Sequence, residues 1–381
     1  MNQSQRVVPL RVVVITNFMP PHPGGIETMA ALLCDGLAEA GHSVRWVASA
    51  EPAPPGRDAR ATRLSAWNPL EARLHVPLPL WGPRALARLT AEVRAADVVH
   101  VHECVNVTSW DAIAVAKALG KPVVLTQHVG FVPYGGALDR VQRLAYHTVG
   151  RFALGRVDAR VAVSPHVAAW FAAQGIVAPF DLVPNARDER LYRPATPEAR
   201  AAAQATLGNP ERVVLFAARL VPKKGVDTVV AAWPEVARRN PGWRLVVAGT
   251  GPLAERFAGL PATRILGQQP QSAMPALFAG ADVYWLPSRG EGFPLTVQEA
   301  MLSDVPVVVS DDPSFLANLH GAPGATILAP GDDVPRALEA AVRTPRDGHV
   351  AAWAAARWAR EAMVRRYVEI YERVLGKLRE T

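Results

Sequence analysis

The sequence predicts an α/β protein of two domains, each built on a doubly wound parallel β-sheet. Its 381 residues are enough for two domains of ordinary size. Short β-branched runs alternate with amphipathic helical stretches along most of the chain, which is typical of parallel sheets covered by helices. This alternation stops between residues 184 and 208, where prolines and charged residues gather, and then starts again. The break therefore marks an interdomain linker.

The first domain is expected over residues 1–190 and opens with a buried strand at 11–16, RVVVIT. The glycine loop FMPPHPGG then leads to an amphipathic helix that stops at Gly41. Further strands are expected at 42–49, 97–102, 121–127 and 159–164. The second domain, 191–360, has expected strands at 212–218, 244–249, 263–267, 282–287 and 306–310. A final amphipathic helix covers 355–379, and we expect residues 361–381 to pack back on the first domain.

The composition narrows the class of protein. Half the residues are apolar and a fifth are charged, which is the ordinary globular mix. The net charge of +7 suits an anionic ligand or surface, but no basic tract indicates nucleic acid. Cys34 and Cys104 are the two cysteines, and we expect both to be reduced and buried. No signal peptide or membrane helix is recognised, so we expect a soluble, cytoplasmic protein.

Ligands of doubly wound sheets bind beyond the carboxyl ends of the strands, so the chemistry is sought in the loops there. The segment PSRGEGFPLTVQEAM places Glu291 in such a loop, Pro294 at a helix start and Glu299 inside that helix. The free N–H groups of residues 295–297 would bind an anion. Carboxylates accept sugar hydroxyls, so a diphosphate on the amides and a sugar or ribose on each carboxylate fit together. The alternative is that both glutamates are ordinary helix-start and surface acids.

Two further loops carry chemistry. In FAARLVPKKGVD, Arg219 ends a strand and Lys224 follows before a glycine. Both could neutralise one diphosphate in place of a metal ion, or they are solvated surface residues. In PPHPGGIE, Gly24 and Gly25 allow close approach of a phosphate or sugar, although the G-x-G-x-x-G dinucleotide fingerprint is absent.

Together these segments resemble the retaining family 4 glycosyltransferases. The matching elements occur in the family's order and cover nearly the whole chain: PPHPGGIE, TQH, AVSPHV, LVPNARD, ARLVPKKGVD, VVAGTGP, ADVYWLPSRGEGFPLTVQEAM and PVVVSD. The E-x7-E pattern is loose alone but specific together with the upstream R-x4-K-G element. The resemblance implies the GT-B fold, in which two Rossmann-like domains face each other across a cleft and the second mainly binds the nucleotide sugar.

The resemblance also implies residue roles. Arg219 and Lys224 would hold the donor diphosphate, Glu291 the transferred sugar and Glu299 the ribose hydroxyls. His128, at a strand end, would face the donor sugar, although taken alone it is more simply a packing histidine. The full donor-binding set adds these residues: Gly24, Gly25, Gly267, Gln269, Gly292, Phe293, Leu295 and Thr296. The donor would be of UDP or GDP type, with no cofactor and no metal; the sequence assigns no role to His100 or His102.

Three departures from the family pattern are visible. Ala218 replaces a glycine before the arginine, and Asp304 stands where a glycine usually follows the helix. Asp tolerates the left-handed conformation expected at that position. The double glycine after PVVVSD is missing. These changes remove no charged group that the chemistry needs.

Sugar transfer requires stabilisation of the leaving diphosphate. The sequence has no Asp-x-Asp motif, and the pairs Asp311–Asp312 and Asp332–Asp333 are most simply turn or cap residues. We therefore expect metal-independent, retaining transfer by same-face attack. The alternatives are an inverting enzyme with His22 as base, a phosphorylase, a sugar-nucleotide epimerase, or a non-catalytic nucleotide-sugar binder.

The acceptor is expected to be a glycan, a glycolipid or another lipid-linked molecule. Residues 56–94 hold seven arginines against three acidic residues, beside the apolar, proline-rich segment LHVPLPLW, which we expect to be an exposed loop. This surface predicts peripheral contact with the anionic inner face of the cytoplasmic membrane. The alternative is a solvated arginine-rich face.

Overall fold

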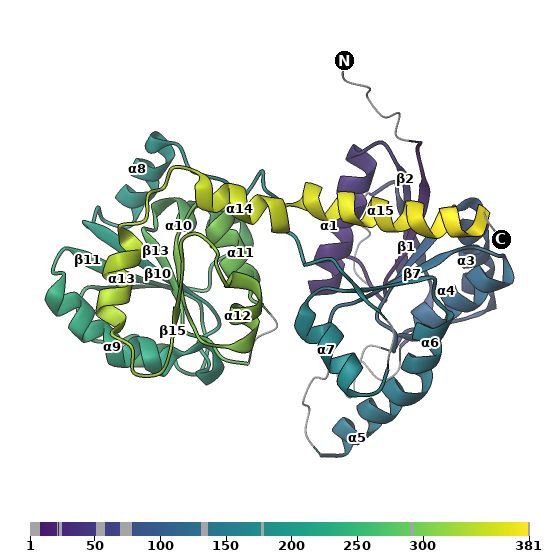
Figure 1. Cartoon of the computed structure of the whole chain (residues 1–381), viewed down its shortest axis with the longest axis horizontal. Helices are drawn as coiled ribbons and strands as arrows, with labels where there is room; N and C mark the ends of the chain where they lie inside the picture. Colours follow the sequence, from purple (N-terminus) through teal and green to yellow (C-terminus); the bar gives the residue numbers. More distant parts are fainter. Residues whose placement is uncertain are drawn as a thin grey trace. The chain divides into compact units, whose positions relative to one another are not determined.

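The structure is a computed structural model, and it describes residues 8–20, 22, 25–50, 58–68, 78–130, 136–176, 179–290 and 293–379. The chain divides into two compact units (Figure 1). The first unit is Met1–Asn185 together with Arg360–Thr381, and the second unit is Ala186–Ala359.

The first unit is built on a parallel sheet of seven strands in the order β3-β2-β1-β6-β7-β8-β9. The strands are β1 (Arg11–Ile15), β2 (Ser43–Ser49), β3 (Ala61–Leu64), β6 (Val98–His102), β7 (Val123–Gln127), β8 (Ala159–Ala162) and β9 (Asp181–Leu182). A small antiparallel pair joins β4 (Ala66–Trp67) to β5 (Leu80–Trp81). The helices are α1 (Gly25–Glu39), α3 (Pro83–Ala95), α4 (Val107–Ala118), α5 (Gly136–Ala145), the π-helical turn η1 (Tyr146–Gly150), α6 (Arg151–Arg156), α7 (Pro165–Ala173) and α15 (Arg360–Arg379).

The second unit has a parallel sheet of six strands in the order β12-β11-β10-β13-β14-β15. The strands are β10 (Arg212–Ala217), β11 (Trp243–Ala248), β12 (Thr263–Gly267), β13 (Val283–Leu286), β14 (Val307–Ser310) and β15 (Ala325–Leu328). The α-helices are α8 (Pro197–Thr206), α9 (Val226–Arg239), α10 (Met274–Gly280), α11 (Leu295–Leu302), α12 (Pro313–Leu319), α13 (Val334–Val342) and α14 (His349–Trp358). Three short 3-10 turns complete it: η2 (Pro222–Lys224), η3 (Ala254–Phe257) and η4 (Gln271–Ala273).

The central strands are buried on both faces because they are runs of β-branched residues. Val13 and Val14 of β1 are completely buried, as are Val308 and Val309 of β14. Every strand expected from such a run is present. In both sheets the strand order reverses beside the first strand of the unit, as in doubly wound folds, so a ligand site is expected at the carboxyl ends there.

Three predictions about local structure are wrong. The expected linker at 184–208 contains helix α8, which Thr196 caps through the backbone N–H of Ala199. The expected exposed loop at 74–81, of which residues 74–77 lie outside the described residues, ends in β5, where Trp81 is buried and donates to Ser49. The expected helix at 355–379 is divided at Ala359, whose backbone is extended (φ −65°, ψ 147°), into α14 and α15.

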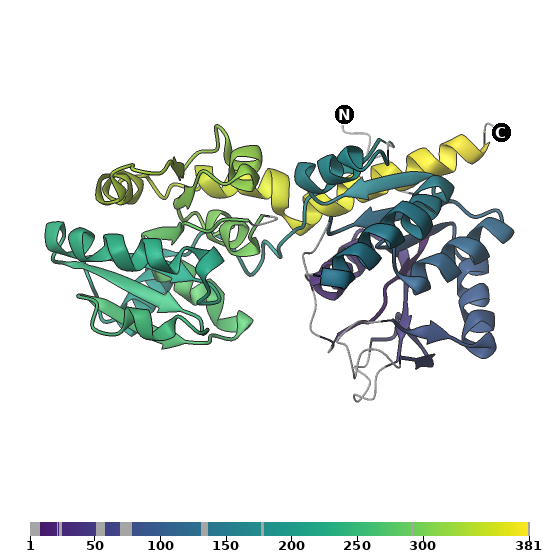
Figure 2. The ribbon, with the colours of Figure 1, turned by 90° about the horizontal axis from the view of Figure 1, so that it is seen from below.

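Helix α15 belongs to the first unit and packs across α1 (Figures 1 and 2). A Cβ on Gly36 of α1 would come within 2.4 Å of Val364, so a glycine lets the two helices approach closely. The Arg360 guanidinium pairs with Glu39 at 2.8 Å. Further along, Tyr367 and Tyr371 are buried in the unit's interior, so α15 completes the core.

Candidate functional site

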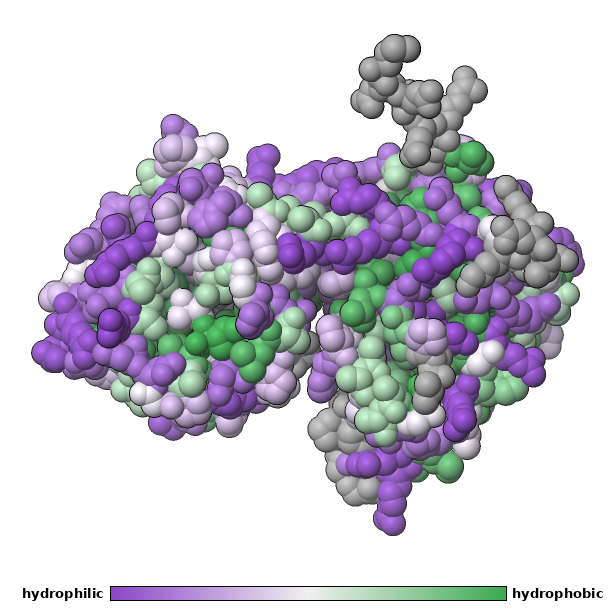
Figure 3. Space-filling model, in the orientation of Figure 1, coloured by the Kyte–Doolittle hydropathy of each residue, from purple (hydrophilic) through white to green (hydrophobic). Residues whose placement is uncertain are grey.

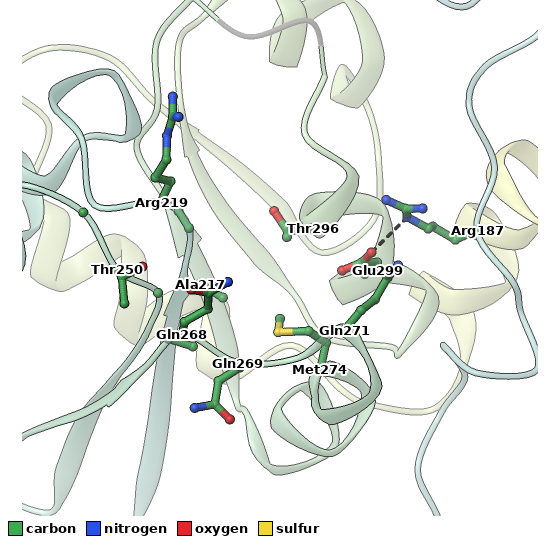
Figure 4. Close-up of a pocket in the computed structure, with 14 residues that line it drawn as sticks. Arg187, Ala217, Arg219, Thr250, Gln268, Gln269, Gln271, Met274, Thr296 and Glu299 are labelled. Carbon is green, nitrogen blue, oxygen red and sulfur yellow. Dashed lines mark ion pairs between the residues drawn. The ribbon is translucent and has the colours of Figure 1, made fainter. Parts of the chain in front are cut away.

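A pocket of about 670 Å³ lies in the second unit beyond the carboxyl ends of β10 and β11 (Figure 4). This volume is in the usual range for ligand sites. Its lining comes from the loops after these strands, from the loop after β12, from α11 and from the start of the unit. The lining residues are Arg187, Ala217, Ala218, Arg219, Ala248, Gly249, Thr250, Gly251, Gln268, Gln269, Gln271, Met274, Thr296 and Glu299.

The loop after β11 requires its two glycines. The backbone of Gly249 has φ +145°, and a Cβ there would lie 1.8 Å from the carbonyl oxygen of Ala218. Gly251 has φ +157°, and its Cβ would lie 2.4 Å from the carbonyl oxygen of Leu220. The G-T-G loop therefore packs directly on the loop that carries Arg219 and brings bare backbone to the pocket. The segment VVAGTGP contributed to the family resemblance, but no site residue was predicted in it.

A buried ion pair forms one wall of the pocket. Arg187 Nε lies 2.9 Å from Glu299 Oε1, and their side chains are only 7% and 5% exposed (Figure 4). Burial raises the pKa of Glu299 to about 7, while the Arg187 charge and the Tyr192 hydroxyl act in the opposite direction. Arg187 was not among the predicted site residues, because its partner is far away in the sequence and no local pattern joins them.

The start of α11 differs from the sequence expectation in one respect. The N–H of Val297 donates to the carbonyl oxygen of Pro294 at 3.1 Å, so it is not free to bind an anion. Thr296 lines the pocket, and its hydroxyl oxygen accepts from the Tyr284 hydroxyl at 2.8 Å. Leu295 is the first helical residue and is half-buried.

The other predicted donor residues of this unit are distributed around the same loops. Arg219 is exposed and extends from the loop after β10 (Figure 4), and Lys224 ends η2, which directly follows that loop. Gln269 lines the pocket and donates to Leu266, while the carbonyl of Gly267 accepts from Gly249 at 2.7 Å. Phe293 does not line the pocket.

The ring of Phe293 instead packs against Trp358, with ring centroids 5.1 Å apart. Three predicted site residues, Gly24, Glu291 and Gly292, lie outside the described residues.

In the first unit, His128 belongs to a stack of three histidines at the carboxyl ends of β6 and β7. His128 Nε2 lies 2.8 Å from His102 Nδ1, and the His102 ring stacks on both His128 and His100. Burial lowers the pKa of His128 to about 4 and that of His100 to about 3, so both imidazoles are neutral near pH 7. His100 is held by Tyr371 at 2.6 Å and by Thr126 at 2.7 Å.

The carboxylate of Glu103 fixes the backbone at His128. It accepts the N–H of His128 at 2.6 Å and that of Val129 at 3.2 Å, and it also accepts from the Gln127 amide. Glu103 is buried, with φ +68°, a strained conformation for a residue other than glycine. Burial raises its pKa to about 7, and these three donors act in the opposite direction. Apart from its position after a strand, nothing in the sequence pattern singled out this residue.

Three smaller expectations agree with the structure. Cys34 and Cys104 are free and buried, as predicted, and burial raises the pKa of both thiols. Asp304 adopts the predicted left-handed conformation with φ +58°, and its carboxylate accepts the N–H groups of Gly348 and Ala351 at the start of α14. Asp312 and Asp333 cap α12 and α13, as the sequence indicated.

In the first βα loop, Gly25 is exposed and begins α1. His22 Nδ1 lies 3.5 Å from Glu27 Oε1, and its ring stacks on Phe18.

Within the described part of the chain, no three His, Cys, Asp or Glu side chains are grouped to hold a metal ion. In the same residues, no helix is long and apolar enough to cross a membrane.

The comparisons with known proteins agree with this geometry. The family model described as Glycosyltransferase Family 4 matches residues 23–191, and the one described as Glycosyl transferases group 1 matches residues 211–345. A GDP-mannose-dependent alpha-(1-6)-phosphatidylinositol monomannoside mannosyltransferase of Mycobacterium tuberculosis is 27% identical, over 91% of this chain and 92% of the relative. A phosphatidylinositol N-acetylglucosaminyltransferase component from Arabidopsis thaliana is 25% identical, over 87% of this chain and 74% of the relative.

Two solved structures show the same fold. The sucrose-phosphate synthase of Thermosynechococcus elongatus matches with a TM-score of 0.69 at 21% identity, covering 97% of this chain and 100% of the other. The Anabaena protein Alr3699/HepE, solved in complex with UDP-glucose, matches with a TM-score of 0.66 at 17% identity, covering 95% and 99%.

The two doubly wound parallel-sheet units, with a pocket beyond the strands of the second, have the GT-B fold of these solved structures. Both matched family models describe glycosyltransferases, and together they span most of the chain. The chain belongs to glycosyltransferase family 4. The fold class, the enzyme class and the family predicted from the sequence are confirmed.

Proposed function

We propose that this glycosyltransferase moves a hexose from a nucleoside-diphosphate sugar to a lipid-linked or glycan acceptor, with retention of configuration and without a metal ion. The observation that carries the proposal is the pocket of the second unit. It combines two arginines, the carboxylate of Glu299 and the bare backbone of the G-T-G loop. Cations and backbone amides suit a diphosphate, and a carboxylate beside them suits hydroxyl groups.

In the proposed mechanism, negative charge develops on the departing diphosphate as the bond to the anomeric carbon breaks. Arg219 and Lys224 stabilise this charge, since an arginine fork and a lysine converge on phosphate oxygens. Glu299 accepts the ribose hydroxyls, and Glu291 accepts hydroxyls of the transferred sugar. The neutral His128 contacts the sugar, and the leaving phosphate takes the acceptor's proton during same-face attack.

The relatives support a donor of GDP or UDP type. The Mycobacterium tuberculosis relative is named for GDP-mannose, and the Anabaena structure contains UDP-glucose. A thermal-shift panel of GDP-mannose, UDP-glucose and UDP-N-acetylglucosamine tests this choice, because a ligand that binds only the folded state raises Tm by mass action. No shift with any donor would contradict the proposal.

The relatives also support a glycolipid acceptor, since both are named for phosphatidylinositol or its mannoside. An acceptor of this kind would bring the enzyme to the cytoplasmic face of the membrane. Contact through residues 56–94 stays a prediction. Part of that segment lies outside the described residues, and Arg60 is engaged by Asp58 at 2.8 Å and Asp35 at 2.6 Å.

The deciding experiment incubates the enzyme with labelled donor and phosphatidylinositol vesicles, with and without excess EDTA. We expect labelled glycolipid in both samples, with the donor's anomeric configuration kept when the product is studied by NMR. Product that needs added magnesium or manganese would remove the metal-free mechanism, and inversion would favour His22 as a base. Formation of sugar phosphate or of an epimerised donor, in place of glycolipid, would favour the phosphorylase or epimerase alternative. The relatives do not support that alternative, since both are named as transferases.

A matched pair of variants tests the pocket itself. Glu299→Gln should abolish the donor-induced rise in Tm. Glu235→Gln alters a glutamate on the surface of α9, in the same unit but not in the pocket, and should leave the rise unchanged. Equal donor responses in both variants would remove the ribose role of Glu299.

A further inference from the structure

The helical segment 136–156 of the first unit has an outer face that the proposed chemistry does not use. Helix α5, the π-helical turn η1 and helix α6 follow one another without a break (Figure 1). The inner face is firmly packed. Tyr146 and Leu154 are buried, the Tyr146 hydroxyl donates to the carbonyl of Gly130 at 2.8 Å, and its ring meets the edges of Trp170 and Phe171.

The outer face carries large apolar side chains in solvent. Val141, Leu144 and Phe152 are 61%, 63% and 61% exposed. Among the described residues, ten large apolar side chains are exposed, and three of them occur within these twelve positions. Single exposed apolar residues are common, but a cluster on one element indicates an interaction surface.

The π-helical turn explains why these side chains share a face. Two ordinary α-helical turns take about 7.2 residues, so side chains eight residues apart would point in different directions from the helix axis. A π-helical turn takes one additional residue because its hydrogen bonds join i to i+5. With η1 between them, Leu144 and Phe152 are two turns apart in nearly the same direction. Val141, three residues before Leu144, extends the same stripe.

Basic residues flank this stripe. The segment contains four arginines, at 140, 143, 151 and 156, against the single acid Asp139. All four arginines and His147 are exposed, and the Arg156 guanidinium lies 4.5 Å from the centre of the Phe152 ring. Figure 3 shows hydrophobic and hydrophilic residues side by side over the part of this unit where Figure 1 draws α5.

We infer that the outer face of 136–156 is a docking surface for a bilayer that contains anionic phospholipid. Val141, Leu144 and Phe152 enter the boundary between headgroups and acyl chains, and the arginines meet the phosphates. Helices with an apolar stripe and arginines at its sides bind anionic bilayers in this way. The charge argues for this occupant over a second copy of the chain, because two such faces would repel each other. The inference rests on the proposed function in one respect: it brings the enzyme to its lipid-linked acceptor.

The first test measures vesicle binding of the full chain without donor. Sucrose-loaded vesicles of phosphatidylcholine with 30% phosphatidylglycerol should sediment the protein at low salt, and pure phosphatidylcholine vesicles should not. Raising the sodium chloride concentration to 0.5 M should release most of the protein, since the screening length then falls well below 10 Å. No sedimentation with the anionic vesicles, or equal sedimentation with both kinds, would overturn the inference.

Two variants test the surface. Val141→Ser combined with Leu144→Ser and Phe152→Ser should weaken partition into the anionic vesicles at least tenfold. The matched control replaces three exposed apolar residues of the second unit, Leu191, Ile265 and Leu316, with serine. Their side chains are 60%, 45% and 45% exposed. This control should bind as the unchanged protein does. Equal partition of the two triple variants would place the binding elsewhere and overturn the inference.

A labelled variant tests insertion directly. Cys34 and Cys104 are buried, so the thiol introduced by Leu144→Cys can be labelled selectively with an environment-sensitive dye. Its emission should shift to the blue on anionic vesicles, whereas that of a Leu191→Cys control should not. An unshifted Leu144→Cys signal on sedimenting protein would overturn the inference.

The donor-induced rise in Tm of the triple serine variant separates this inference from the proposed function. Retained donor response with lost vesicle binding is the expected result. An absent donor response in the unchanged protein would remove the proposed function and leave the docking surface standing.

Discussion

Replacing Arg187 by methionine removes the partner of a buried carboxylate and should shift the pH at which the donor binds. At an effective dielectric constant of about 20, opposite charges at the separation in this pair attract by about 6 kcal/mol, part of which offsets the desolvation of both groups. If about 3 kcal/mol of net stabilisation is lost, the pKa of Glu299 rises by roughly 2 units. It would then move from about 7 to roughly 9.

The consequence for donor binding follows from the ionised fraction of Glu299. At pH 7.5 this fraction would fall from about three quarters to a few per cent, so the apparent donor affinity should weaken about 20-fold. At pH 9.5 the variant and the unchanged protein should differ much less. A direct contact between Arg187 and the donor would instead weaken binding equally at both pH values.

Isothermal titration of the nucleotide sugar between pH 6 and 9.5 measures this shift. Arg187→Lys should preserve most of the profile because it keeps the charge. Arg289→Met removes an exposed arginine that pairs with Asp311 at 2.7 Å in the same unit, and it should change nothing. Identical pH profiles for Arg187→Met and the unchanged protein would refute the reasoning.

Three further predictions concern the free energy of unfolding. Gly249→Ala should lower it by more than about 2 kcal/mol, because the new Cβ collides with a carbonyl oxygen at 1.8 Å. Glu103→Gln should flatten the dependence of the free energy of unfolding on pH. Because the pKa of Glu103 rises from 4.5 in the unfolded chain to about 7 in the folded protein, the folded state binds the proton more tightly. The free energy of unfolding of the unchanged protein therefore falls as the pH rises from 4.5 to about 7. The variant should remove up to about 3 kcal/mol of this fall between pH 4 and 8. Tyr371→Phe should cost about 1–3 kcal/mol, since it leaves a buried imidazole nitrogen without its partner.

Urea unfolding measures all three effects, with a comparison for each. Gly290→Ala, where φ is +70° but no atom lies within 4 Å of the new Cβ, should cost about 1 kcal/mol. An equal loss for both glycine variants would contradict the close contact at Gly249. An unchanged slope of stability against pH in Glu103→Gln would contradict the raised pKa. If Tyr371→Phe is as stable as the unchanged protein, the hydrogen bond between the Tyr371 hydroxyl and His100 does not contribute to the free energy of unfolding.

The sequence predicted what depends on local pattern. Buried parallel strands such as β1 and β14 are continuous β-branched runs, so their positions could be read directly. Strands β9 and β15 were missed because the first has two residues and the second is only half-buried at the sheet edge. Helix α8 was mistaken for linker because Pro197 stands at its first position, where a proline is tolerated in a helix.

The residues of the candidate site also fall into two groups, those that a local sequence motif indicates and those that it does not. Arg219 and Glu299 stand in motifs that follow strands, so their loops could be assigned from the sequence alone. Arg187 and Glu103 act through partners on other strands or helices, and no spacing along the chain reveals such pairs. The histidine stack depends on the register of β6 and β7, which sets His102 beside Thr126.

The position of α15 has a consequence for how the protein is made. Its residues leave the ribosome after the whole second unit, yet they complete a core that begins with β1. The nascent first unit therefore waits with the surface of α1 uncovered while the whole second unit is synthesised and can fold. A stop codon just before Arg360 would deprive His100 of its hydroxyl partner and Glu39 of its guanidinium, and would damage the unit whose translation began first.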